Sequence, residues 1–236
     1  MSEGTAEHHV PVLAIDGPGG AGKGTISRLV ASRLGWHLLD SGALYRLVAL
    51  EAIQRSVPLD AEPALTGLAT RLDARFQACG DQVRVLLNGV DVTDAIRSEA
   101  AGDGASRVAA LPGVRGALIQ RQRNFRQPPG LVADGRDMGA VVFPDADLKV
   151  FLTASLEERV RRRHKQLKDK GIDVSLSDLS RDMVERDRRD SERSVAPLKP
   201  SDDARILDTT GMEIPGVVTV VLQWASEMNV PVRQRT

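Results

Sequence analysis

The sequence contains a single cysteine, Cys79, so it has neither a partner for an intrachain disulfide nor the cysteines for a multi-cysteine zinc site. It also has no apolar run that approaches the length of a membrane span. The N-terminal stretch MSEGTAEHHV lacks the cationic and apolar regions of a signal peptide. These absences lead us to expect a cytoplasmic protein with no membrane partner.

The sequence also has no formal net charge and few aromatic side chains. Lys+Arg and Asp+Glu both total 32, so the formal net charge is zero, and only 3% of the residues are aromatic. Proteins that bind nucleic acid carry a basic surface, and those that bind single strands add aromatic side chains on which bases stack. The composition therefore argues against a nucleic-acid partner, and it leaves one local basic run, RVRRRHK at 159–165, to explain.

Short apolar runs alternate with helical patterns along most of the chain, which predicts a parallel sheet covered by helices on both faces. Residues 63–105 break this order, because Asn88-Gly89 between β-rich flanks predicts a hairpin in a small antiparallel insertion. The fold class is therefore a three-layer α/β fold with a sheet of about five strands. The expected strands are VPVLAID (10–16), WHLLD (36–40), LVADG (131–135), LKVFLTA (148–154) and ARILDTT (204–210).

A glycine-rich loop, DGPGGAGKGT from Asp16 to Thr25, joins the first expected strand to a helix. Its glycines and Lys23 fit the P-loop pattern, in which backbone N–H groups and a helix N-terminus hold phosphates while the lysine reaches the terminal ones. Gly24 stands where the usual pattern has Ser or Thr, so coordination of Mg²⁺ by Thr25 stays open. No asparagine is followed by lysine, which argues against the guanine-reading motif of a GTP-binding switch protein.

The segment GPGGAGKGT resembles the phosphate loop of nucleoside monophosphate kinases. Four further stretches, LLDSGALYR, ASRVAALPGVR, ADGRDMGAVVFPDA and ERDRRDSERSVAPL, closely resemble bacterial cytidylate kinases, and the similarity runs from about Val12 to about Asp208. The resemblance implies phosphoryl transfer from ATP to CMP, with dCMP as a second acceptor, in pyrimidine nucleotide metabolism. It also implies Mg²⁺ held mainly through the phosphates of ATP, and a monomeric chain.

The same resemblance implies a site in two halves. ATP would lie on Gly17, Pro18, Gly19, Gly20, Ala21, Gly22, Lys23, Gly24 and Thr25. CMP would contact Ser41, Tyr45, Arg46, Ser106, Arg115, Asp134, Arg136, Asp137, Arg186, Asp190 and Arg193. Catalysis would need no general base, because the acceptor phosphate is already a nucleophile, and would depend on electrostatic positioning by Lys23, Arg136, Arg186 and Arg193.

Individual residues fit these roles chemically. On a helix, Arg186, Asp190 and Arg193 would share one face. The resemblance to cytidylate kinases implies that Arg186 and Asp190 lie near the sugar hydroxyls and Arg193 near a phosphate. The carboxylate of Asp137 would accept a hydrogen bond from the exocyclic amine of cytosine and repel the carbonyl of uracil. Arg115 would donate to the acceptor edge of the same base.

We expect a core of residues 10–62, 106–154 and 195–236, an acceptor-binding insertion at 63–105, and a lid with an arginine-bearing helix at 155–194. The basic run is assigned to this lid, whose closure would exclude water, and a solvated helix is the alternative. Two other functions stay open: a P-loop kinase for another small acceptor such as UMP, AMP or a hydroxylated metabolite, and a nucleotide-dependent nucleic-acid-binding protein.

Overall fold

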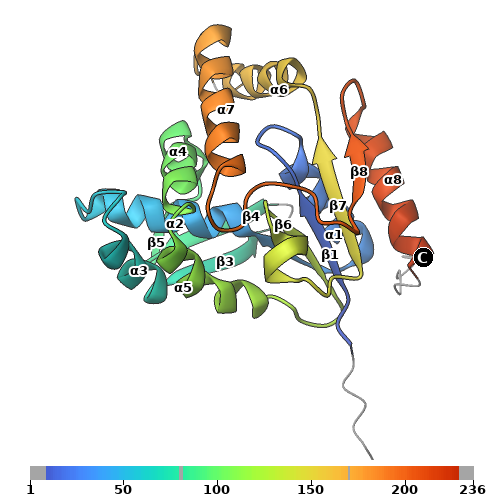
Figure 1. The fold of residues 1–236 in the computed structure, drawn as a ribbon, viewed down its shortest axis with the longest axis horizontal. Coiled ribbons are helices and arrows are strands. Elements are labelled where there is room, and N and C mark those ends of the chain that lie inside the picture. The colour runs from blue at the N-terminus through green and yellow to red at the C-terminus, as the bar shows by residue number, and fades with distance from the viewer. Residues whose placement is uncertain (1–8, 80–81, 170, 229–236) are drawn as a thin grey trace, which may run out of the picture.

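The computed structural model describes residues 9–79, 82–169 and 171–228. A five-stranded sheet with the order β2-β6-β1-β7-β8 forms its centre (Figure 1). All four neighbouring strand pairs are parallel, so the predicted α/β class is confirmed. The strands fall within the five predicted runs: β1 (Val12–Asp16), β2 (His37–Asp40), β6 (Leu131–Asp134), β7 (Leu148–Thr153) and β8 (Arg205–Asp208).

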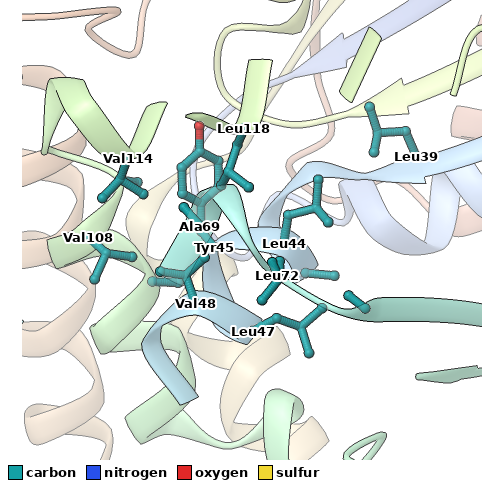
Figure 2. Packing of buried hydrophobic residues seen from close by; sticks show 14 of the residues in the cluster. Leu39, Leu44, Tyr45, Leu47, Val48, Ala69, Leu72, Val108, Val114 and Leu118 are labelled. Carbon is teal, nitrogen blue, oxygen red and sulfur yellow. The ribbon is translucent and has the colours of Figure 1, made fainter. Parts of the chain in front are cut away.

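Helices cover both faces of this sheet, as the alternating pattern predicted. The helices that form the cores on the two faces of the sheet are α1 (Lys23–Leu34), α2 (Ser41–Gln54), α3 (Glu62–Thr70), α5 (Pro112–Arg123) and α8 (Ile214–Glu227). Leu13 and Ile15 of β1 belong to the core formed with α1 and α8, whereas Val12 and Ala14 belong to the core formed with α2, α3 and α5 (Figure 2). Because β1 is buried on both faces, its sequence is a continuous apolar run instead of an alternating one.

The insertion is a three-stranded antiparallel sheet with the order β3-β4-β5, followed by a short turn of helix η1 (Ala95–Arg97). Its strands are β3 (Ala74–Cys79), β4 (Gln82–Leu87) and β5 (Val90–Asp91). Asn88 and Gly89 connect β4 to β5 and have φ values of 50° and 82°. Two residues with positive φ match the right-handed twist of the flanking strands, so the predicted hairpin is confirmed.

Three helices stand beyond the carboxyl end of the parallel sheet: α4 (Glu99–Val108), α6 (Leu156–Lys168) and α7 (Leu176–Ser191) (Figure 1). In this view α7 stands upright and α6 runs across its upper part, and the two helices share a small core of Val160, Leu167 and Leu179. Within the described ranges, no helix has the length and hydropathy needed to span a membrane.

Candidate active site

A cleft of about 1000 Å³ opens at the carboxyl edge of the parallel sheet, where open α/β folds bind their ligands. The phosphate loop, α2, α4, α6, α7 and the segments after β6 and β8 all contribute to its walls. Every predicted site residue lines this cleft except Gly17 and Pro18. Gly17 lies against β7 with φ of 147°, and a Cβ atom there would come within 2.0 Å of the Leu152 carbonyl oxygen, so the position requires glycine.

The phosphate loop ends where α1 begins, at Lys23. Gly22 precedes the helix in a left-handed conformation, with φ of 91°, and no acidic residue lies in the first turn. The positive end of the helix dipole is therefore open to a bound anion. The Lys23 Nζ donates to the Pro18 carbonyl oxygen at 2.8 Å. Burial, together with the charge of Arg136, lowers the pKa of Lys23 to about 7.

Oxygen ligands for a cation face the same end of the cleft. Asp134 ends β6 and is buried, and burial raises the pKa of its carboxyl group to about 6. Thr25 and Asp134 both line the cleft beside the loop. The described part of the chain holds no cluster of three or more His, Cys, Asp or Glu side chains that could bind a metal by itself. This donor set suits Mg²⁺, which binds to one or two carboxylates together with substrate phosphates.

A buried ion pair also lines the cleft. Arg115 of α5 pairs with Asp137, which follows β6, and the two residues are 7% and 4% exposed. The Arg115 guanidinium carbon lies 5.9 Å from the ring centroid of Tyr45 on α2. Residues from three separate segments thus form one polar cluster. It lies at the edge of the core formed with α2, α3 and α5, near the position of Tyr45 in Figure 2.

Asp190 on α7 holds a second cluster together. Its carboxylate accepts hydrogen bonds from Ser106 Oγ at 3.2 Å and Arg136 Nε at 3.0 Å, and Arg193 Nη2 lies 3.4 Å away. Burial alone would raise the pKa of Asp190, but Arg136, Arg193 and Arg186 hold it below its usual value. The carboxylate is therefore charged and shared among the cationic side chains of the cleft.

Comparison with known proteins gives the family. A model described as cytidylate kinase matches residues 13–227. The chain belongs to the cytidylate kinase family. The cytidylate kinase of Pseudomonas paraeruginosa is 62% identical over 215 residues, 90% of this chain and 94% of that protein. Those of Aeromonas hydrophila and Bordetella pertussis are 57% identical over 217 residues and 58% identical over 214, covering 92% and 91% of this chain and 94% of each relative.

Membership of the cytidylate kinase family confirms the predicted resemblance and the class of enzyme. Kinases of nucleotides take ATP as phosphoryl donor, which agrees with the phosphate loop at one end of the cleft. Ser41 and Tyr45 lie one turn apart on α2, and Asp40 caps this helix by accepting from the Ala43 backbone N–H at 3.0 Å. Arg46 pairs with Asp40 at 3.6 Å.

One predicted placement is wrong. Arg193 does not share a helix face with Arg186 and Asp190, because α7 ends at Ser191. The Arg193 Nε instead donates to the Asp190 carbonyl oxygen at 3.2 Å, and so satisfies one of the acceptors that the last turn of a helix leaves free. A helical period read from sequence cannot show where the helix stops.

Arg186 lies closer to the phosphate loop than its helical spacing alone indicated. A Cβ atom at Gly19 would lie 4.0 Å from Arg186 Nε and 3.7 Å from Arg136 Nη2. Burial and the neighbouring Arg136 lower the pKa of Arg186 to about 10. Among the described residues, its Nε is buried without a hydrogen-bond partner. Two guanidinium groups thus meet where the donor and acceptor halves of the cleft join.

The sequence interpretation missed two arginines that join α6 to other segments of the cleft, one to the phosphate loop and one to the segment after β8. Arg159 is buried, donates to the Gly19 carbonyl oxygen at 3.1 Å and pairs with Asp187 of α7 at 2.7 Å. Arg162 donates to the Thr209 carbonyl oxygen at 2.6 Å. The solvated-helix alternative is therefore wrong for these two positions. Their i, i+3 spacing, which sets them on one helix face, is the signal that could have found them.

Proposed function

We propose that the protein transfers the γ-phosphoryl group of ATP to CMP, giving ADP and CDP, and accepts dCMP as a second substrate. The observation that carries this proposal is the buried Arg115–Asp137 pair, which lines the same cleft as the phosphate loop. A carboxylate accepts from the amine of cytosine and faces a repelling carbonyl in uracil. Burial raises the pKa of Asp137, and the adjacent Arg115 opposes this shift. The guanidinium also has N–H groups left for the acceptor edge of the base.

The donor half of the site depends on the phosphate loop. The backbone N–H groups of residues 17–25 and the Lys23 ammonium would hold the triphosphate. Thr25 and Asp134 are the oxygen donors available to Mg²⁺, which would neutralise part of the phosphate charge when bound. A bound triphosphate would also favour the protonated form of Lys23, whose pKa burial has lowered.

The acceptor half orients the monophosphate. Ser41, Arg46 and Arg193 line the cleft at the acceptor side and suit its phosphate oxygens, because a guanidinium fork binds phosphate in two-point fashion. Ser106 and Asp190, already hydrogen-bonded to each other, suit the sugar hydroxyls. Tyr45 lies against Arg115 and limits the space available to the base.

Phosphoryl transfer then occurs between these halves. The acceptor phosphate oxygen attacks in line, and Arg136 and Arg186, which meet near Gly19, stabilise the charge on the transferring group. No general base is needed. The nearness of Arg186 to the loop supports a role on the phosphoryl group over a role on the sugar.

We further infer a core of residues 10–62, 106–154 and 195–236, an acceptor-binding insertion at 63–105 and a lid at 155–194. The contacts of Arg159 and Arg162 with the loop and Thr209 support closure of α6 over the donor. We also propose a cytoplasmic monomer that binds no nucleic acid; the zero net charge supports the last point.

A panel of acceptors tests the activity. With ATP and Mg²⁺ in an ADP-coupled assay, we expect turnover of CMP and dCMP, and far lower values of kcat/KM for UMP and AMP. A kcat/KM for UMP or AMP equal to that for CMP would identify a kinase for another acceptor. Salt-dependent binding of an oligonucleotide without phosphotransfer would favour the nucleic-acid-binding alternative.

A further inference from the structure

Asp16 is a buried carboxylate that the proposed reaction does not use. It is the last residue of β1 and lies directly before Gly17, at the entrance to the phosphate loop, yet it is 8% exposed and does not line the cleft. A buried ionisable group with no contact to substrate requires a structural explanation, because taking a charge out of water is costly.

The two oxygens of Asp16 both accept from backbone N–H groups of another segment. Oδ1 accepts from Met138 N at 2.8 Å and Oδ2 from Gly139 N at 2.9 Å. These are the first two residues of the helical turn η2 (Met138–Val142), whose N–H groups have no partner within the turn itself. A third hydrogen bond, from Gly135 N to the Ile15 carbonyl oxygen at 3.0 Å, joins the same two segments.

The residues between these anchor points are Arg136 and Asp137. The segment is held on both sides, by Gly135 before them and by Met138 and Gly139 after them. It has little freedom to shift sideways, since a Cβ atom at Gly135 would come within 2.7 Å of both Met138 Cγ and Ser41 Oγ. The direction of the two acceptor-binding side chains is therefore fixed by backbone hydrogen bonds that end on Asp16.

We propose that Asp16 is a positioning residue that fixes Arg136 and Asp137 relative to the phosphate loop, and thereby sets the binding and base preference of the nucleotide acceptor. The proposal rests on the proposed function for the identity of that acceptor. Only a carboxylate suits the position fully, because it presents acceptors alone, whereas an asparagine would turn an N–H₂ group toward one of the two backbone N–H groups.

Asp16→Asn is the matched test, since it keeps the shape of the side chain and removes one acceptor. Burial raises the pKa of Asp16 to about 7, so the assays are run at pH 8. We expect KM for CMP to rise about tenfold or more and the ratio of kcat/KM for CMP over UMP to fall, while KM for ATP changes less than twofold.

Asp147→Asn provides the control. The Asp147 carboxylate also accepts from a backbone N–H of β1, Val12 N at 2.7 Å, but at the opposite end of the strand and outside the cleft. This variant should lower the thermal midpoint without changing the CMP-specific KM or the CMP/UMP ratio. A purely structural role of Asp16 would give the same pattern in Asp16→Asn and would overturn the proposal, as would an equal rise in KM for CMP and ATP.

Asp16→Glu keeps the inference testable if Asp16→Asn does not fold. It retains two acceptors but displaces them by one methylene group, so we expect a smaller rise in KM for CMP with KM for ATP unchanged. Unchanged KM for CMP in the folded Asp16→Glu variant would contradict the proposal. Failure of the proposed function is a separate outcome, because the wild-type protein would then show no preference for CMP.

Discussion

The donor and acceptor halves of the cleft differ in whether their buried charged side chains have ion-pair partners. Lys23 forms no ion pair with a carboxylate of the described chain, and its Nζ donates to a backbone carbonyl instead. Asp137 and Asp190, by contrast, are each paired with arginines, Arg115 on one side and Arg136 with Arg193 on the other. The acceptor half is neutralised by its own side chains, whereas the donor half is not.

This difference shows what each half requires from its ligand. Burial has moved the pKa of Lys23 down to about 7 and that of Asp134 up to about 6, so both groups are near the point where they lose their charge. A triphosphate and its cation supply the missing opposite charges. In the acceptor half, arginines hold the pKa of Asp190 below its usual value, and Arg115 opposes the rise that burial causes in the pKa of Asp137. Both carboxylates are oriented by their arginine partners, which suits the recognition of base and sugar. Substitutions in the two halves should therefore change different kinetic constants.

The largest effect is expected for Lys23→Ala, which removes the only lysine of the phosphate loop. The kcat should fall about 10²- to 10³-fold, because the ammonium stabilises phosphate charge in the transition state. Steady-state kinetics with CMP measure the loss, and circular dichroism should show an unchanged fold. Lys168→Ala, at an exposed position near the end of α6, is the control. Near-normal turnover of Lys23→Ala would refute the assignment of the loop.

A smaller effect, confined to the acceptor, is expected for Asp137→Asn. The amide can donate to the uracil carbonyl as well as accept from the cytosine amine, so the ratio of kcat/KM for CMP over UMP should fall about 10- to 100-fold. Asp203→Asn, which weakens the pair with Lys149 at 2.8 Å away from the cleft, should leave the ratio unchanged. An unchanged ratio in Asp137→Asn would mean that another residue reads the base.

The two halves also differed in how well the sequence predicted them. The phosphate loop is one continuous segment between a strand and a helix, and its pattern depends on local backbone geometry, so Gly17 to Thr25 could be read directly. The acceptor pair Arg115–Asp137 joins α5 to the segment after β6, 22 residues later. Only the family resemblance related these two residues, because no local period links them.

What could not be predicted depends on the register of distant segments. Asp16 was visible in the quoted loop, but its partners Met138 and Gly139 are 122 and 123 residues away. The parallel pairing of Ile15 with Asp134 brings Asp16 close to Met138 and Gly139. The order of strands in the sheet cannot be inferred from either segment alone. The end of α7 at Ser191 was also missed, because the helical spacing of Arg186, Asp190 and Arg193 continues past the point where the helix ends.

The pH dependence of the free energy of unfolding should show that Lys23 has no ion-pair partner among the described residues in the protein without ATP. The pKa is about 7 in the folded chain and about 10.4 for an unfolded lysine. Between pH 7 and 10 the unfolded chain therefore binds a proton that the folded chain lacks, and this group makes stability rise with pH. Urea midpoints at pH 7.0 and 9.5 should show a larger gain for wild type than for Lys23→Met, and saturating ATP should reduce the wild-type gain. Equal gains in both proteins would contradict the lowered pKa.

The smallest effect is expected where α4 meets the two lid helices, because these contacts serve both halves equally. Glu99 and Asp103 lie one turn apart on α4 and pair with Arg163 of α6 and Arg189 of α7, the latter at 2.6 Å. Exposed pairs of this kind contribute about 0.2–1 kcal/mol each and weaken in salt. If they favour the closed cleft, their loss should raise KM for ATP and CMP together.

The double variant Glu99→Gln, Asp103→Asn tests the contribution of these ion pairs to closure of the cleft, without changing the proposed substrate-binding residues of either half. Both KM values should rise about two- to fivefold, following the size of such pairs, while the CMP/UMP ratio stays constant and the salt dependence of kcat/KM decreases. Glu192→Gln, Glu227→Gln makes the same charge change at residues whose partners, Arg188 and Arg205, do not bridge to α4. A rise confined to one substrate would mean that α4 belongs to that half of the site alone, and that the two halves do not close through shared contacts.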